Sequence, residues 1–205
     1  MHRVTSVLLI VLAVSSVAAA QDRMPPIPPQ KMNDAQRKAA SELQEARGYA
    51  LRGPWHAWLR SPDLMARILE LSDYLRFNSA LPPRLSEFVI LMTARHWSQQ
   101  YEWQAHYDLA IKGGLKPEVA RGVAEGRRPE GMAEDETALY SLISELLHNK
   151  SVSDDTYAKA LAKFGEQGVV DAVAISGYYA TVAMILNTAR TPLPGDMTPP
   201  LKSLP

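Results

Sequence analysis

The segment from Arg84 to Lys112 decides the fold and reads RLSEFVILMTARHWSQQYEWQAHYDLAIK. It is rich in apolar and helix-forming residues and has no internal proline or glycine. Pro82-Pro83 precedes it and Gly113-Gly114 follows it, and these pairs are typical of helix starts and stops. We therefore expect a helical region between them.

Polar residues recur along this segment at helical spacing. Gln99, Glu102 and His106 are separated by three and four positions, so they share one face if they lie on one helix. Arg95 extends the same stripe if the helix is continuous through residues 95–106. A carboxylate beside a histidine orients the imidazole and favours its protonated form, which prepares it for general acid–base catalysis.

A second stripe runs beside the polar one. Its members are four apart along the chain and should face the core: Trp97, Tyr101, Ala105 and Leu109. A simpler interpretation of the polar stripe is also open, because Glu–His pairs on helix surfaces are common and contribute only a few tenths of a kcal/mol. We predict no metal site, since Glu102 and His106 supply two ligands and a catalytic zinc takes three from the protein.

Outward from this segment the pattern stays helical. Asn33 with Gln36 forms a capping box for a helix reaching about Ala50, and Ser61 followed by Pro62 begins another. Pro117 begins a short helix. Apolar stripes at helical spacing mark further helices. They include Leu64, Ile68, Leu71 and Leu75, then Leu139, Leu142, Ile143 and Leu146, then Tyr157, Ala160, Leu161 and Phe164.

The last helix differs from the others because it is apolar nearly all round. It should run from about Gly168 to Thr188, after a helix with Ser153 as N-cap and Gly165 as stop. A helix of this kind is buried in the centre of a domain or at a subunit interface. With no convincing strand in the sequence, we predict an all-α domain of seven or eight helices covering residues 33–190.

The two ends of the chain are distinct from this domain. Met1 to Ala20 resembles a secretory signal: a short basic start, an apolar run from Val7 to Val14 and an Ala18-Ala19-Ala20 cleavage site. We expect cleavage after Ala20 and export to the periplasm; a retained N-terminal anchor is the alternative. Residues 21–32 form a proline-rich arm and residues 191–205 a proline-rich tail, both expected to be extended.

Composition removes several classes of function. The 205 residues carry 22 basic and 22 acidic side chains, so no basic excess points to nucleic acid. There is no cysteine, which excludes disulfides, thiolate nucleophiles and cysteine-based metal sites. At 46% apolar and 21% charged residues, the composition is that of a globular domain.

The stretch from Glu87 to His106 resembles the carboxymuconolactone decarboxylase family, which includes alkylhydroperoxidase D. In the peroxidase branch a Glu is followed by a Cys twelve positions on, a second Cys three further and a His four beyond that. Glu87 is followed at those intervals by Gln99, Glu102 and His106. The outer Glu and His are kept, and both Cys positions are replaced.

Flanking segments extend the resemblance over about residues 33–190. They are Leu91-Met92-Thr93-Ala94-Arg95, Tyr101-Glu102-Trp103, Gly114-Leu115, Phe164-Gly165-Glu166 and Gly177-Tyr178-Tyr179 through Met184 to Asn187. The resemblance implies an all-helical, alkylhydroperoxidase D-like bundle that assembles as a homotrimer or homohexamer. Thiol–disulfide exchange, the chemistry of the peroxidase branch, needs two cysteines that this chain lacks.

The decarboxylase branch of the family needs no cofactor and acts on a carboxylated unsaturated lactone. The resemblance therefore implies a cofactor-independent lyase with His106 as proton donor and Glu102 orienting it. Arg95 would hold a carboxylate or stabilise the enolate, and Glu87 would orient His106 or support Arg95.

Four more residues are candidates for substrate binding. They are Gln99, Tyr101, Trp103 and Tyr178, and core packing is an alternative for each of the three aromatic ones. Two further hypotheses stay open for the whole protein: a non-catalytic ligand-binding or assembly protein on the same scaffold, and a peroxide-linked oxidoreductase, which the missing cysteines disfavour.

Overall fold

Eight α-helices and no strand make up the part of the chain that the computed structural model describes, residues 21–195 and 197–203. The helices are α1 (Asp34–Arg47), α2 (Pro54–Trp58), α3 (Pro62–Phe77), α4 (Pro83–His96), α5 (Gln100–Lys112), α6 (Pro117–Ala124), α7 (Glu134–Asn149) and α8 (Asp154–Ala189), preceded by a 3-10 turn, η1 (Pro29–Lys31). The predicted all-α class is confirmed. The predicted signal segment, residues 1–20, lies outside the described residues.

Local capping signals set most helix starts. Asn33 Oδ1 accepts a hydrogen bond from the Gln36 amide (2.9 Å), and Gln36 Oε1 accepts one from the Asn33 amide (3.1 Å). This predicted capping box is confirmed, although α1 stops at Arg47 because Gly48 adopts a left-handed conformation (φ 70°). Proline occupies the first turn of α3, α4 and α6, as predicted.

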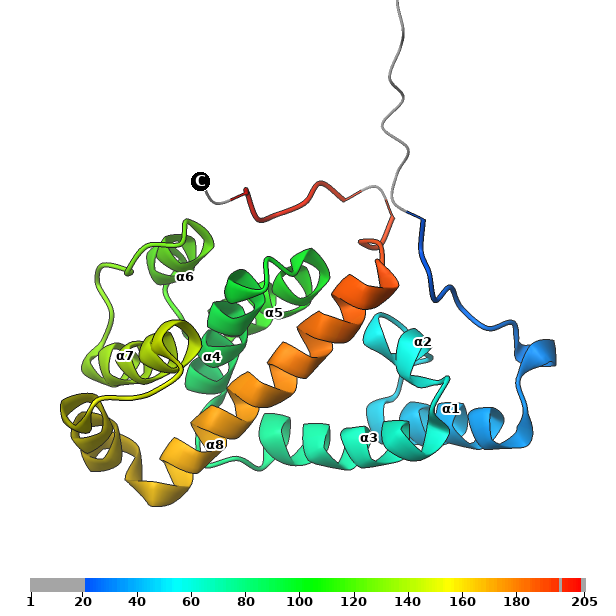
Figure 1. The fold of residues 1–205 in the computed structure, drawn as a ribbon, viewed down its shortest axis with the longest axis horizontal. Helices are drawn as coiled ribbons and strands as arrows, with labels where there is room; N and C mark the ends of the chain where they lie inside the picture. Colours follow the sequence, from blue (N-terminus) through cyan, green and yellow to red (C-terminus); the bar gives the residue numbers. More distant parts are fainter. Residues whose placement is uncertain (1–20, 196, 204–205) are drawn as a thin grey trace, which may run out of the picture.

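Helix α8 is the central element of the domain. It packs against α2, α3, α4, α5 and α7, and Figure 1 shows it running diagonally between α1–α3 on one side and α4–α7 on the other. Its most apolar 18-residue window has a mean hydropathy of 1.7 and is 56% buried, which fits a helix at the centre of a helical domain. Both halves of the fold therefore meet on α8.

The apolar final helix is not buried all round in the single chain. Val170 (65%), Val173 (40%) and Met184 (44%) are exposed along one side of α8. The helix is also longer than predicted. Gly165 has non-helical φ/ψ (66°, 176°), so the predicted stop is real, but the chain resumes a helix at once. Ser153 caps the preceding part, as predicted.

The predicted helical region 84–112 is two helices. Helix α4 ends at His96, Ser98 takes a positive φ of 50°, and α5 begins at Gln100. The buried face of α5 carries Glu102, Trp103, His106 and Ala110. The predicted core stripe is therefore wrong, because its two members on the outer part of α5, Ala105 and Leu109, are exposed.

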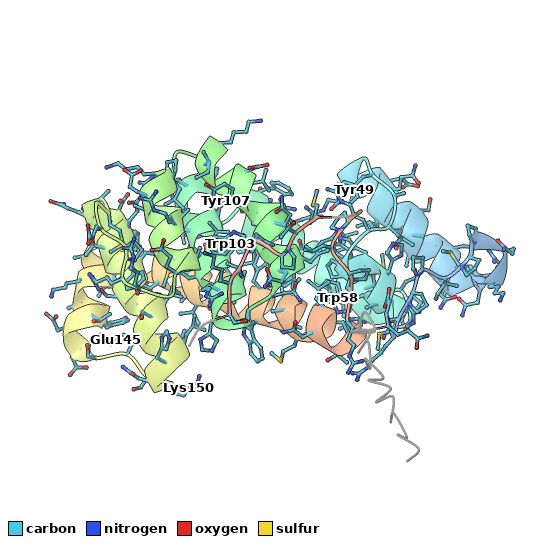
Figure 2. All side chains as sticks on the ribbon, turned by 90° about the horizontal axis from the view of Figure 1, so that it is seen from above. Tyr49, Trp58, Trp103, Tyr107, Glu145 and Lys150 are labelled. Atoms are coloured by element: carbon cyan, nitrogen blue, oxygen red, sulfur yellow. The ribbon has the colours of Figure 1, made fainter. Side chains whose placement is uncertain are left out.

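Both ends of the described chain pack against the domain. The Arg23 amide donates to the Ala189 carbonyl (2.7 Å), which ties the N-terminal segment to the end of α8. Near the other end Leu201 is buried, and Figure 1 shows the C-terminal segment passing beside α5. Figure 2 locates Trp103 and Tyr107 on α5, where their rings stack at 6.3 Å.

Candidate active site

A cavity of about 320 Å³ lies where α3, α5 and α8 converge. Its walls include Glu102 and His106 from α5, Tyr178 and Tyr179 from α8, and Arg76 from α3. Pro194 and Met197 of the C-terminal segment complete the lining on another side. The cavity is thus built from parts of the chain that are far apart in sequence.

His106 is held from behind by a carboxylate. Its Nδ1 lies 2.6 Å from Glu87 Oε2, and both side chains are buried. With Glu87 ionised, Nδ1–H donates to that oxygen, and Nε2 has no hydrogen-bond partner among the described residues. The Tyr179 ring meets the imidazole edge-on at 4.9 Å and fixes its plane. His106 is therefore a preoriented imidazole at a cavity wall.

Glu102 is a buried acid without a partner. It is 2% exposed, and neither carboxyl oxygen has a hydrogen-bond partner among the described residues. Burial raises the pKa of Glu102 well above its ordinary value, which favours the neutral form. The structure does not place Glu102 as the residue that orients His106. Glu87, the other residue considered for that role, reaches Nδ1 from α4.

Burial also changes the two neighbouring tyrosines. It raises the pKa of Tyr178 to about 12, partly offset by hydrogen bonding to Ser72 and by nearby arginines. It raises the pKa of Tyr179 well above its usual value. The two rings meet edge-on at 5.0 Å, so they form a stiff, neutral wall that can also donate hydrogen bonds.

Tyr101 lies at the rim of the cavity, where it depends on a glycine. The Tyr101 ring approaches Gly53 so closely that a Cβ there would lie 2.6 Å from it, and Gly53 also has a positive φ of 53°. Arg52 stacks on the Tyr49 ring at 3.8 Å on the same rim. Tyr101 and Tyr178 therefore both reach the cavity, as do Glu102 and His106.

Arg95 and Gln99 do not reach it. Arg95 donates to the Lys202 carbonyl (2.9 Å), and it lines a separate, smaller cavity of about 130 Å³ with His96 and His148. Gln99 caps α5 by accepting from the Tyr101 amide (2.7 Å) and donates to Asn187 Oδ1 (2.9 Å). The break at Ser98 turns both side chains away from the stripe that the sequence suggested.

Trp103, another predicted substrate-binding residue, does not line this cavity either. It is 4% exposed and stacks on Tyr107 on the side of α5 that faces α6 and Pro200, away from the cavity. Core packing, the alternative raised for its sequence pattern, describes its environment.

Sequence reasoning missed Tyr179, Arg76 and Ser72 as cavity residues. Tyr179 was hidden in an apolar helix, where an aromatic residue is typical of a core. Arg76 and Ser72 lie on α3 with no motif around them, and only the packing of α3 against α8 brings them to the cavity. No group of three or more His, Asp or Glu side chains in the described part of the chain is arranged to hold a metal ion.

Comparison with solved structures identifies the architecture. The alkylhydroperoxidase AhpD core of an uncharacterised peroxidase-related protein from Ralstonia eutropha JMP134 superposes with a TM-score of 0.66 over 81% of this chain and 88% of that one, at 18% identity. An AhpD-type protein of unknown function from Agrobacterium tumefaciens gives a TM-score of 0.61 over 68% and 96% of the chains, also at 18% identity.

This chain has the alkylhydroperoxidase D-like fold. The debrominase Bmp8 shares it, with a TM-score of 0.64 over 83% of this chain and 91% of that one at 10% identity. A variant of Bmp8 was solved in complex with 2,3,4-tribromopyrrole. No protein-family model matches the sequence, and a search of curated proteins finds no match. Proteins of different chemistry share this alkylhydroperoxidase D-like architecture, so the reaction must be argued from the site.

Proposed function

We propose that this protein is a cofactor-independent acid–base lyase that removes CO2 from a small carboxylated lactone or related acid. The observation that carries the proposal is the pairing of a preoriented imidazole, His106 on Glu87, with a buried, partnerless Glu102 in one cavity. The first can deliver a proton. The second can stabilise a developing negative charge.

The reaction would proceed in two steps. The bond between the carboxylate and the ring carbon breaks, CO2 leaves, and the electron pair moves into the conjugated carbonyl to give an enolate. Neutral Glu102 donates a hydrogen bond to the enolate oxygen, where charge develops. Protonated His106 then gives its Nε2 proton to the carbon, and water reprotonates the imidazole. Glu87 stabilises the imidazolium before the transfer.

The absence of thiols weighs against peroxide chemistry. Disulfide exchange needs an attacking and a resolving cysteine, and this chain has none. Gln99 and Glu102 stand at the two positions where the peroxidase pattern has cysteines. Gln99 serves as a helix cap and Glu102 as a buried acid, so neither position offers a redox group.

The proposal is tested by incubating the purified protein with a panel of carboxylated lactones and keto acids. Product is followed by proton NMR and released CO2 is trapped and quantified. We expect turnover of at least one compound, reduced about 1000-fold in His106→Ala. His148→Ala, which alters an exposed histidine outside this cavity, is the control and should match the wild type. A ligand that binds but is recovered unchanged would favour a binding protein instead.

We also propose export and self-assembly. The signal-like sequence of residues 1–20 supports export, and mature protein beginning at Gln21 in a periplasmic fraction would test it by mass spectrometry. The exposed apolar side chains Val170, Val173 and Met184 on α8 support self-association, for which the family resemblance suggests a homotrimer or homohexamer. Light scattering of the purified protein would show a monomer if that proposal is wrong.

A further inference from the structure

Two arginines approach the Tyr178 side of the cavity, and their surroundings differ. Arg47 has a side chain that is 4% exposed, pairs with Asp73 (2.7 Å) and donates to the Ser72 hydroxyl (2.8 Å). Arg76, one turn along α3 from Ser72, makes no ion pair or hydrogen bond with any described residue, and its Nε is buried. The Phe77 ring lies beside both guanidinium groups, at 5.0 and 5.2 Å.

Arg76 is therefore a half-buried cation without a counter-ion. Removing a guanidinium from water is costly unless an anion or hydrogen-bond acceptor replaces the lost solvent. The Nη2 group of Arg47 has that replacement in Asp73 and Ser72, although its Nε and Nη1 have no partner, whereas no guanidinium nitrogen of Arg76 has a partner in the described part of the chain. The missing partner can be a bound ligand, because Arg76 lines the cavity.

The charge around the cavity favours an anion. Arg52 and Arg76 are the basic side chains of its lining, apart from the imidazole of His106. The one carboxyl group that lines it among the described residues is Glu102, whose burial favours the neutral form. Arg52 is exposed and stacked on Tyr49, whereas Arg76 lies near the Tyr178 and Tyr179 phenols. Arg76 is thus the lining arginine that lies beside Tyr178 and Tyr179 and has no hydrogen-bond or ion-pair partner among the described residues.

We propose that Arg76 is the anion-binding residue of this cavity and binds a carboxylate of the ligand. A planar carboxylate can accept two parallel hydrogen bonds from one guanidinium, which fixes both position and orientation. The body of the ligand would then lie along the Tyr178–Tyr179 wall toward Glu102 and His106. The proposal rests on the proposed function for the reaction of the bound carboxylate. It assigns to Arg76 the carboxylate-binding role that the family resemblance suggested for Arg95.

Binding to matched probes tests this assignment without turnover. The probes are 5-oxotetrahydrofuran-2-carboxylate and its methyl ester, which differ in charge at one group. Titration calorimetry would compare the wild type with Arg76→Gln, Arg76→Lys and the control Arg67→Gln, an exposed arginine on the same helix. Equal melting temperatures would establish that the variants are folded.

We expect Arg76→Gln to weaken binding of the carboxylate about tenfold or more, with ester binding changed less than about twofold. The affinity of Arg76→Lys for the carboxylate should lie between those of the wild type and Arg76→Gln, and Arg67→Gln should match the wild type. Equal weakening of acid and ester, or no weakening, would overturn the proposal. If acid binding depends on Arg76 but no compound is turned over, the proposed function fails and this assignment stands. If a compound is turned over but the Arg76 variants bind the acid as tightly as the wild type does, the assignment of Arg76 fails and the proposed function stands.

Discussion

The two sides of the α4–α5 junction carry similar polar residues but organise them differently. On one side Glu102 and His106 line a cavity, and Glu87 supports the imidazole from α4. On the other side Arg95 and Gln99 bond to the chain itself, at Lys202 and Asn187. Members of both groups lie before and after the break at Ser98 (φ 50°), so packing and not sequence order decides which group each residue joins.

The two groups differ in whether their polar side-chain atoms have hydrogen-bond partners within the protein. The Gln99 amide has protein partners for its oxygen and its nitrogen, so its hydrogen-bonding capacity contributes to stability. Both oxygens of Glu102 lack a partner among the described residues, which costs stability. A buried carboxyl group without a partner, in the same cavity wall as an oriented histidine, is typical of a catalytic site. A fully hydrogen-bonded amide at a helix cap is typical of a residue with a structural role.

Among the variants that test this comparison, the largest effect should come from Glu87, which positions His106 at the cavity. Glu87→Gln keeps the shape but removes the negative charge next to His106, so we expect kcat to fall about 100-fold with little change in KM. Arg95→Gln, on the other side, should change kcat less than about twofold. Comparable losses in both variants would erase the distinction between the two sides.

The second effect concerns stability and pH. The pKa of Glu102 lies well above 4.5, its ordinary value, in the folded protein. At pH values between the pKa of the unfolded state and that of the folded state, the folded protein keeps a proton that the unfolded protein has lost. The Glu102 contribution to the free energy of unfolding is therefore full at low pH and is lost as pH rises through that window. The slope reaches about 1.4 kcal/mol per pH unit.

Glu102→Gln isolates this contribution, because every other titrating group is unchanged. Urea unfolding at a series of pH values from about 5 to about 8 should show the free energy of unfolding of the variant rising relative to that of the wild type as pH increases. Parallel stability curves for the two proteins would mean that Glu102 ionises normally in the fold.

A smaller effect is expected at the junction. Gln99→Ala removes the cap of α5 and the bond to Asn187, and should lower the free energy of unfolding by about 1 kcal/mol while leaving ligand binding nearly unchanged. Gln44→Ala, at an exposed position in α1, provides the comparison for loss of a glutamine side chain. A large loss of binding without loss of stability would place Gln99 with the cavity instead.

The smallest effect should be local to the C-terminal segment. Gln100 bonds both backbone groups of Leu201, accepting from its amide (2.8 Å) and donating to its carbonyl (2.9 Å). Gln100→Ala should speed hydrogen exchange at the Leu201 amide and change global stability by less than about 1 kcal/mol. Unchanged exchange would mean that burial of Leu201 alone holds the segment in place.

Much of the fold could be predicted because its signals are local. The Asn33–Gln36 box, the first-turn prolines and the break at Gly165 act through backbone geometry within a few residues. The site was predicted less completely. His106 and Glu102 followed from helical spacing, but the spacing could not reveal that Ser98 would end the stripe or that Trp103 would pack away from the cavity.

The sequence by itself determined that the domain is helical, that no cysteine is available for thiol chemistry and that Glu102 and His106 share a helix face, while the family resemblance added Glu87. Only the tertiary structure decided which carboxylate supports the imidazole, and it brought Arg76 and Tyr179 to the same cavity. The physical reason is range. Capping and periodicity act along the chain, whereas burial and pairing depend on how α3, α4 and α5 pack on α8.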